Sequence, residues 1–237
     1  MVTKVPWLDD RQLTFPAIEE ALDDPDGLLA AGGDLSVRRL LLAYQRGIFP
    51  WYSDDQPILW WSPAHRGVLY PDNLKISRSL RKVLAKQTFS VHVDRDFPAV
   101  IRACSEARSY ADSTWITPEM QAAYIRLHEH GYAHSIECYQ GTKLAGGLYG
   151  IGLGNLFFGE SMFHVVTDAS KVAFAHLTRL MQSLGCPLID CQLDTRHLQT
   201  LGVCEIPRQR FRQVIEEYTL PSYQIDWTQV PSSLPAW

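Results

Sequence analysis

Two apolar stretches of the sequence contain polar side chains of the kind that carry chemistry. Glu160 lies within the apolar run 156–163. Asp190 and Gln192 lie within a second apolar run, 188–192. A carboxylate placed among apolar residues costs free energy unless it is paired or used, so both carboxylates are candidates for a functional site.

The second stretch is predicted to be a strand that carries an acid and an amide side by side. Strand alternation places Asp190 and Gln192 on one face and Cys191 on the other. This set is a poor metal site and lacks the serine or cysteine partner of a nucleophilic triad. It could receive a hydrogen bond from an amine and align a carbonyl, which suits acyl transfer to an amine. An aspartate that only caps the following turn explains the residues equally well.

The glutamate of the first stretch has apolar neighbours. On a regular strand, Phe158, Glu160 and Met162 share one face. The carboxylate is then either a structural ion-pair partner or a binding group for a cationic substrate, with the neighbouring side chains forming a hydrophobic acyl pocket. The glycines of residues 146–159 do not form the G-x-x-x-x-G-K-[ST] motif, so the sequence does not predict a nucleotide cradle there.

The elements that position these residues are predicted from caps and periodicity. Residues 1 to about 35 are expected to be irregular because proline and glycine interrupt them often. Helices are predicted after Ser36, Ser77, Asp96, Thr117 and Asp168, with a last one through Phe211, Ile215 and Tyr218. Strands are predicted at 67–70, 89–93, 133–139, 144–151, 156–160 and 188–192, and an extended or loose tail after Pro221. This order predicts a mixed α/β sheet with helices on its faces and a domain boundary near Pro63.

Composition limits the class of protein. The chain has 237 residues, of which 46% are hydrophobic and 20% charged, as in an ordinary soluble globular protein. No apolar run is long enough to cross a membrane and the N-terminus lacks a secretory signal, so we expect a cytoplasmic protein. The five cysteines are irregularly spaced, which favours reduced and mostly buried thiols over disulfides or a zinc site.

Two further features are compatible with nucleic acid. The predicted helix after Ser77 has a basic face without interleaved acids, although the net charge of the chain is −4. That face is either simply solvated or contacts a phosphate backbone. Its residues are Lys75, Arg78, Arg81, Lys82 and Lys86. The aromatic residues of the segment 47–63, Trp51 among them, form either a small core or a stacking surface for a base or ligand.

Several long motifs resemble bacterial leucyl/phenylalanyl-tRNA–protein transferases. They are Gly32–Ser36, Ala43–Trp51, Ile58–Pro63, Thr114–Thr117, His134–Glu137, Phe158–Phe163, Leu188–Gln192 and Leu201–Arg208. The family moves leucine or phenylalanine, and methionine less well, from aminoacyl-tRNA to proteins that begin with arginine or lysine, which creates a degradation signal. The resemblance implies an α+β fold in two domains. Residues 1–64 form a small N-terminal domain, and residues 65–237 form a domain like the GCN5-related N-acetyltransferases, with a mixed, mostly antiparallel sheet flanked by helices.

The resemblance also implies how the donor is held. Trp51 and Trp115 match the rings that hold the 3′-terminal adenosine of the tRNA. Leu148, Phe157 and Met162 match the aminoacyl pocket, although methionine occurs in some relatives at the position of the leucine. The basic helix matches the region that holds the acceptor stem.

Catalytic roles follow from the same resemblance. Asp190 and Gln192 match the acid and amide of catalysis, and Glu160 matches a carboxylate near the acceptor amine. Thr195 stands where some members carry asparagine, which leaves its role open. Because the aminoacyl ester is already activated, we expect no metal and no other cofactor. The group that handles the proton is left open between these side chains and a ribose hydroxyl, and we expect a monomer without a membrane partner.

Two other functions compete with this interpretation. An acetyl-CoA-dependent N-acetyltransferase would normally carry a glycine-rich loop for the pyrophosphate, and the segment His164–Ser170 contains no glycine. A non-catalytic tRNA-binding module would leave Asp190 and Glu160 without a purpose.

Overall fold

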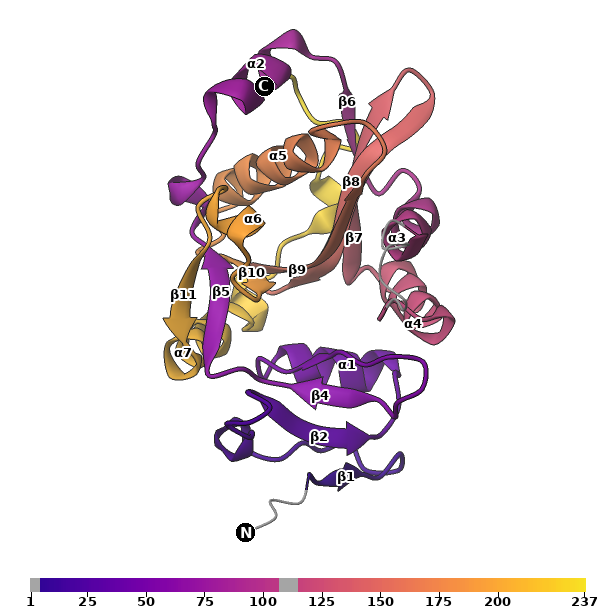
Figure 1. The fold of residues 1–237 in the computed structure, drawn as a ribbon, viewed down its shortest axis with the longest axis vertical. Helices are drawn as coiled ribbons and strands as arrows, with labels where there is room; N and C mark the ends of the chain where they lie inside the picture. The colour runs from indigo at the N-terminus through magenta and orange to yellow at the C-terminus, as the bar shows by residue number, and fades with distance from the viewer. Residues whose placement is uncertain (1–4, 107–114) are drawn as a thin grey trace.

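The computed structural model describes residues 5–106 and 115–237, so Thr114 of the fourth motif lies outside the described residues. These described residues form two sheets, one of four strands and one of seven. Figure 1 shows the smaller sheet, coloured indigo to purple, at one end of the molecule and the larger sheet with its helices above it.

The smaller sheet is built from the first 61 residues. Its order is β1 (Trp7–Leu8), β2 (Leu28–Gly32), β4 (Leu59–Trp61) and β3 (Phe49–Pro50). Helix α1 (Val37–Tyr44) follows the predicted cap, where the Ser36 hydroxyl accepts a hydrogen bond from the Arg39 amide. The prediction of an irregular segment before residue 35 was wrong for β1 and β2. Because β2 is a short apolar run without alternation, its sequence carries no strand period.

The larger sheet contains the predicted strands in a mixed arrangement. Its strands are β5 (His65–Leu69), β6 (Ser90–Val93), β7 (Ala133–Gln140), β8 (Lys143–Leu153), β9 (Leu156–His164), β10 (Ile189–Gln192) and β11 (Cys204–Pro207). Their order in space is β11-β5-β10-β9-β8-β7-β6, and each neighbouring pair is antiparallel except β9 with β10. The fold is therefore α+β with a mixed, mostly antiparallel sheet. The short edge strand β11 was not predicted.

Helices cover both faces of this sheet. They are α2 (Arg78–Lys86), α3 (Phe97–Glu106), α4 (Pro118–Glu129), α5 (Ala169–Ser183), α6 (Arg196–Gln199) and α7 (Arg208–Tyr218), with short 3₁₀ turns at Ile18–Glu20, Pro71–Asn73, Pro221–Tyr223 and Trp227–Gln229. Helix α5 packs against β7, β8 and β9 on one face, and α3 and α4 pack against the other (Figure 1). The predicted side-chain cap at Asp168 was wrong, because its carboxylate contacts Lys171 at 2.8 Å instead of a helix amide.

Two apolar cores stabilise the arrangement. One joins the smaller sheet and helices α1, α3 and α4 to the larger sheet, and the other lies under α5. Trp60 is fully buried in the first core and donates its indole N–H to the Gly32 carbonyl at 2.9 Å. Trp51, by contrast, is 45% exposed. The aromatic segment 47–63 therefore supplies both a core and an exposed ring.

The C-terminal tail is ordered against the sheet rather than loose. The Val93 amide donates to the Ser232 carbonyl at 3.0 Å, and the Leu234 amide donates to the Val91 carbonyl at 2.9 Å. The tail thereby covers the edge strand β6, whose backbone groups would otherwise face water. Within the described residues, no helix is both long and apolar enough to cross a membrane. The five cysteines are free thiols, three of them buried, as predicted.

Candidate active site

The candidate site opens where the parallel strands β9 and β10 separate. Their register pairs Ile189 with Phe157 and Asp190 with Phe158, and the pairing ends there. Beyond these pairs, each strand has an irregularity. In β9 the residue Glu160 has no partner in β8, and in β10 the register shifts between Asp190 and Gln192. Two diverging carboxyl ends of parallel strands leave a crevice, which is a common place for a ligand.

A cavity of about 360 Å³ fills this crevice. It is lined by Phe49, Pro50, Trp51, Trp115, Leu148, Tyr149, Gly159, Glu160, Ser161, Met162, Phe174, Leu177, Cys191, Gln192, Leu193, Thr195, His197 and Leu198. Most of these side chains are apolar or aromatic, and one carboxylate lies among them, so the cavity suits an apolar group that carries a cation or amine nearby.

The bulge in β9 changes which residues share a face. Tyr149 pairs with Ser161 and Gly150 pairs with Gly159, so Glu160 is the extra residue. Phe158 lies in the core with α1, whereas Met162 packs on the core under α5. The prediction that both share a face with the glutamate was wrong, because one extra residue reverses the alternation of the strand.

Glu160 is held at the cavity wall by three donors. The Tyr44 hydroxyl donates to Oε1 at 2.7 Å, the Tyr124 hydroxyl to Oε2 at 3.0 Å, and the Gln192 side-chain amide to Oε1 at 3.3 Å. Loss of water around the carboxylate raises the pKa of Glu160 from 4.5 to about 7, against the two tyrosine hydrogen bonds, which lower it. The charge of Asp190 adds to the rise.

Asp190 lies behind the cavity and not in its lining. Its side chain is fully buried and forms a two-pronged ion pair with Arg66, from Nε to Oδ1 at 2.8 Å and from Nη2 to Oδ2 at 2.7 Å. Oδ1 also accepts the Gln192 backbone amide at 3.0 Å. The aspartate therefore fixes the backbone of the residue whose side chain reaches Glu160.

Arg66 links this aspartate to the segment that carries Trp51. Its Nη1 donates to the Gly47 carbonyl at 3.1 Å, and its guanidinium lies 4.6 Å from the Phe49 ring centroid and 4.7 Å from that of Phe211. The ion pair thus connects β5, β10 and residues 47–49 just before the exposed tryptophan. A guanidinium held by a carboxylate and aromatic faces is a rigid support.

Sequence reasoning missed Arg66, Tyr44 and Tyr124. The arginine lies in β5 just before its apolar residues Val68 and Leu69, and that position is the one signal in the sequence for a buried partner. Tyr44 is fully buried on α1, but its hydroxyl contact with Glu160 is a long-range one that helical periodicity cannot indicate. The sequence indicates that Glu160 needs donors and does not identify them.

The predicted donor-site residues are largely brought together. Trp51, Trp115, Leu148 and Met162 all line the cavity, with Trp51 on its exposed rim. Phe157 is absent from the cavity lining. Its ring is fully buried 5.9 Å from the Trp227 ring, so it supports the sheet from the core. Thr195 lines the cavity and caps α6 by accepting the Leu198 amide at 3.3 Å.

The rim is shaped by one close backbone contact. A Cβ atom at Gly67 would lie 2.6 Å from the Leu193 carbonyl carbon. Glycine therefore lets the segment after β10 cross β5 closely and bring Leu193, 47% exposed, to the cavity mouth. Among the residues described, no group of three or more His, Cys, Asp or Glu side chains could hold a metal ion.

Comparison with known proteins identifies the family. The family model described as "Leucyl/phenylalanyl-tRNA protein transferase" matches residues 68–216, and that of the corresponding N-terminal domain matches residues 33–64. This chain belongs to the leucyl/phenylalanyl-tRNA–protein transferase family. The two matched ranges contain every residue that lines the cavity.

Curated members of this transferase family are similar over nearly their whole length. A leucyl/phenylalanyl-tRNA–protein transferase of Aromatoleum aromaticum is 57% identical over 215 residues, 91% of this chain and 90% of that protein. The one of Pseudomonas syringae is 52% identical over 222 residues, 94% and 97% of the two chains. The solved structure of L-PGS from Bacillus licheniformis matches with a TM-score of 0.39 at 11% identity, over 70% of this chain and 53% of that chain, and similarity at this level carries no inference.

The two family models leave parts of the chain unmatched. Arg66 lies between the two matched ranges, and the tail from residue 217 lies beyond the second. The basic helix α2 lies within the match, packs on α5 and is absent from the cavity lining. Its four basic side chains and that of Lys75 before it are all exposed, and none forms an ion pair within residues 5–106 and 115–237.

Proposed function

We propose that the protein transfers leucine or phenylalanine, and methionine less well, from aminoacyl-tRNA to the N-terminal arginine or lysine of acceptor proteins. The observation that carries the proposal is the cavity, where an apolar lining meets one carboxylate with a pKa raised to about 7. An apolar side chain and an amine are the two groups that must meet in this reaction. The family membership of the chain gives the reaction class.

The donor is proposed to occupy the cavity between rim and floor. Trp51 and Trp115 stack on the terminal adenosine, because large rings at a half-exposed mouth hold any flat base. Leu148 and Met162, with Phe174, surround the aminoacyl side chain. An apolar pocket separates leucine from phenylalanine by only about 1–3 kcal/mol, which fits the use of both.

Glu160 is proposed to receive the proton of the acceptor amine. An α-ammonium has a pKa of about 8, close to the pKa of about 7 of this carboxyl group, so the proton can pass between them with little change in free energy. The amine nitrogen then bonds to the ester carbon, the bond from that carbon to the ribose oxygen breaks, and the ribose oxygen takes the second proton of the nitrogen. The ester is already activated, so no cofactor is needed.

Asp190 and Gln192 are proposed to position the reacting groups. The aspartate is fully paired with Arg66 and has no path to a substrate proton, so it acts through the backbone of Gln192. The side-chain amide of Gln192 orients the Glu160 carboxylate. Gln192 lines the cavity in which the amine would bind, whereas Asp190 does not.

Four finer points belong to the same proposal. We assign residues 1–64 and 65–237 to two domains, since the smaller sheet ends at Trp61 and the larger begins at His65. The second domain is proposed to be like the GCN5-related N-acetyltransferases, supported by its mixed sheet with a single parallel pair at the cavity. We also propose that the protein is cytoplasmic. We propose a monomer as well.

A transfer assay tests the proposal. Labelled leucine, phenylalanine and methionine are supplied as aminoacyl-tRNA, with peptides that begin with arginine, lysine or alanine. We expect transfer to the first two peptides only, in the order leucine and phenylalanine before methionine. Label on the alanine peptide at a similar rate would contradict the acceptor assignment. Binding of acetyl-CoA to the protein, measured by isothermal titration calorimetry, would instead favour an N-acetyltransferase.

The adenosine stack gives the first mutational prediction. Trp115→Ala should raise KM for aminoacyl-tRNA by about 10-fold, since stacking on one ring stabilises a bound base by about 1–3 kcal/mol. Steady-state kinetics measure KM and kcat separately. Trp7→Ala is the matched control, because Trp7 is 70% exposed and is absent from the cavity lining. An effect on kcat alone would contradict stacking.

The basic helix α2 gives the second mutational prediction. Charge reversal of Arg78, Arg81 and Lys82 should weaken tRNA binding and lower the slope of log Kd against log salt by about 2–3, roughly one unit for each lost phosphate contact. Filter binding at several salt concentrations measures the slope. Reversal of three exposed basic residues elsewhere, at Arg126, Lys143 and Arg210, changes the net charge equally and should leave most of the slope. Equal slopes for both variants would contradict a specific site.

A further inference from the structure

The carboxylate of Glu160 closes a ring of three oxygen contacts with two tyrosines. Oε1 contacts the Tyr44 hydroxyl at 2.7 Å, and Oε2 contacts the Tyr124 hydroxyl at 3.0 Å. The two hydroxyls also contact each other at 2.5 Å. Both tyrosines are fully buried, one at the end of α1 and the other in α4, so the ring joins the smaller sheet's helix to a helix of the larger sheet.

The number of protons in this ring depends on the charge of the carboxyl group. Each tyrosine contributes one hydroxyl proton and an ionised carboxylate contributes none. Two protons are then shared among three oxygen contacts, so in one contact two lone pairs face each other. When Glu160 is protonated, three protons serve three contacts, and every oxygen–oxygen contact in the ring is a hydrogen bond. The ionised ring therefore lacks one proton.

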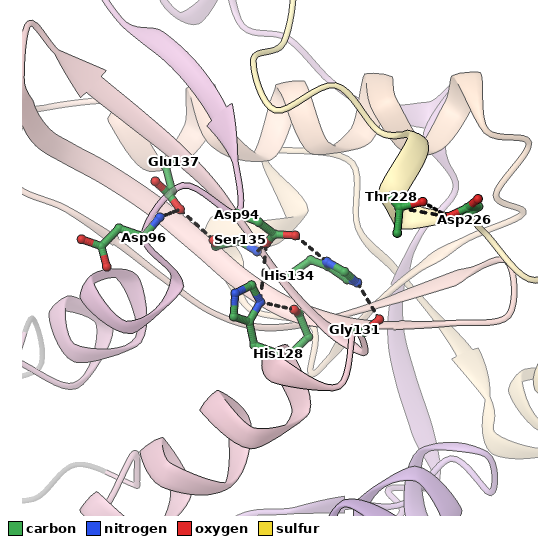
Figure 2. A network of polar contacts seen from close by, with 10 residues as sticks. Asp94, Asp96, His128, Gly131, His134, Ser135, Glu137, Asp226 and Thr228 are labelled. Atoms are coloured by element: carbon green, nitrogen blue, oxygen red, sulfur yellow. Dashed lines mark hydrogen bonds and ion pairs between the residues drawn. The ribbon is translucent and has the colours of Figure 1, made fainter.

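A second buried carboxylate shows the contrast. Glu137 accepts from the Asp96 backbone amide at 2.8 Å, from the Ser135 hydroxyl at 2.8 Å and from the Tyr139 hydroxyl at 2.9 Å. Figure 2 shows the first two of these contacts within a polar network that also contains His134 and Asp94. Each contact has its own donor proton while the carboxylate is ionised. All three contacts of Glu137 thus have a donor proton, whereas one contact of the ring at the cavity has none.

We propose that Tyr44 and Tyr124 are positioning residues that make Glu160 part of a proton-accepting ring, which takes up the proton released by the acceptor amine. This rests on the proposed function. In the step, an N–H bond of the α-ammonium breaks and an O–H bond forms on the carboxylate. The neutral amine is then free to attack the ester, and the ring returns its proton to water after the product leaves.

The electrostatics of the three groups agree with this role. Burial raises the pKa of both Tyr44 and Tyr124 well above 10, and the charge of Glu160 raises it further, so the phenols keep their own protons. Of the three groups, the carboxyl alone changes its protonation near neutral pH, with a pKa of about 7. The tyrosines therefore act through the glutamate and do not themselves exchange protons with a substrate.

Phenylalanine at either tyrosine is the test, read as a pH profile. Loss of one hydroxyl removes one hydrogen bond to the charged carboxylate in the ionised ring and two neutral hydrogen bonds in the protonated ring, and these losses are similar because a hydrogen bond to a charged group is about twice as strong as a neutral one. The loss also removes the contact in which two lone pairs face each other, which only the ionised ring has. The acidic limb of the single-turnover rate should therefore move down by about one pH unit in Tyr124→Phe and Tyr44→Phe. Tyr139→Phe removes the same hydroxyl from the other buried carboxylate and should leave the limb in place.

A titration without tRNA separates this inference from the proposed function. The ¹³C-labelled side-chain carboxyl of Glu160, assigned by its loss in Glu160→Gln, is followed by NMR against pH. We expect a midpoint of about 7 in the wild-type protein and a lower one in the two tyrosine variants. A wild-type midpoint near 4.5, or midpoints that are unchanged or raised in both variants, would overturn the ring even if transfer is observed. Absence of transfer with the expected midpoints would overturn the proposed function and not the ring. If the tyrosine variants do not fold, the midpoint of the wild-type carboxyl titration still tests the ring.

Discussion

Asp190→Asn is expected to lower the free energy of unfolding by about 3–5 kcal/mol. The substitution leaves the Arg66 guanidinium charged and buried, with its two-pronged partner gone. The substitution should also lower transfer activity in the protein that remains folded, because the same ion pair fixes Gly47 before Trp51 and the backbone of Gln192. Urea denaturation and the transfer assay measure the two effects.

Two control variants make this prediction specific. Glu19→Gln removes the partner of Arg212 from an ion pair of 2.7 Å that is about half exposed, and it should have no measurable effect on stability. The double variant Arg66→Met with Asp190→Leu replaces the whole buried pair and should regain most of the stability. It should not regain transfer, since the link to Gly47 is also lost. A double variant with the wild-type rate would refute the positioning role.

Glu160→Gln is expected to abolish most activity and yet stabilise the protein. The pKa of Glu160 is raised to about 7 in the folded state, against 4.5 for the unfolded chain. The folded protein therefore binds the proton more tightly, and this contribution to stability is full below pH 4.5 and is lost as pH rises to about 7. Glutamine is neutral at every pH, so above that range it should stabilise by about 2 kcal/mol, after a discount for partial exposure to the cavity.

Denaturation of both proteins on either side of this window checks the sign. The difference in unfolding free energy should be larger at about pH 8 than at about pH 5. Glu137→Gln is the contrasting control, because its amide has one oxygen in place of the two that accept hydrogen bonds from Asp96, Ser135 and Tyr139, so it should destabilise at both pH values. A glutamine at 160 that destabilises at the higher pH would contradict the raised pKa.

Local rules predicted most of the helices and strands. Ser36, Ser77 and Thr117 each cap a helix through the side chain, as their positions before apolar periodic segments indicated. Such signals are local, because a cap and the helix that it begins are neighbours in sequence. Residues 28–32 carried no such signal, since a short apolar run fits a buried helix as well as a strand.

The sequence indicated polar residues of the candidate site, but it did not indicate how their side chains are arranged. Glu160, Asp190 and Gln192 were identified as polar groups in apolar strands, and all three do meet at the diverging ends of β9 and β10. Their side chains do not lie on one face as regular strands would place them. Each strand carries a bulge, and the position of a bulge depends on the partner strand. Contacts between residues far apart in sequence, such as Arg66 with Asp190 or Tyr44 with Glu160, follow from the fold and leave no period in the sequence.

Single-turnover transfer of labelled leucine from Leu-tRNA to a peptide that begins with arginine, by the wild-type protein and by Glu160→Gln, tests the central claim most directly. The wild-type rate should rise with pH to a plateau, with a midpoint at about 7. The glutamine variant should be at least about 100-fold slower throughout, the size of effect that a positioned proton acceptor has. A variant rate within about threefold of wild type at the plateau would contradict the assignment of Glu160 as the group that receives the proton.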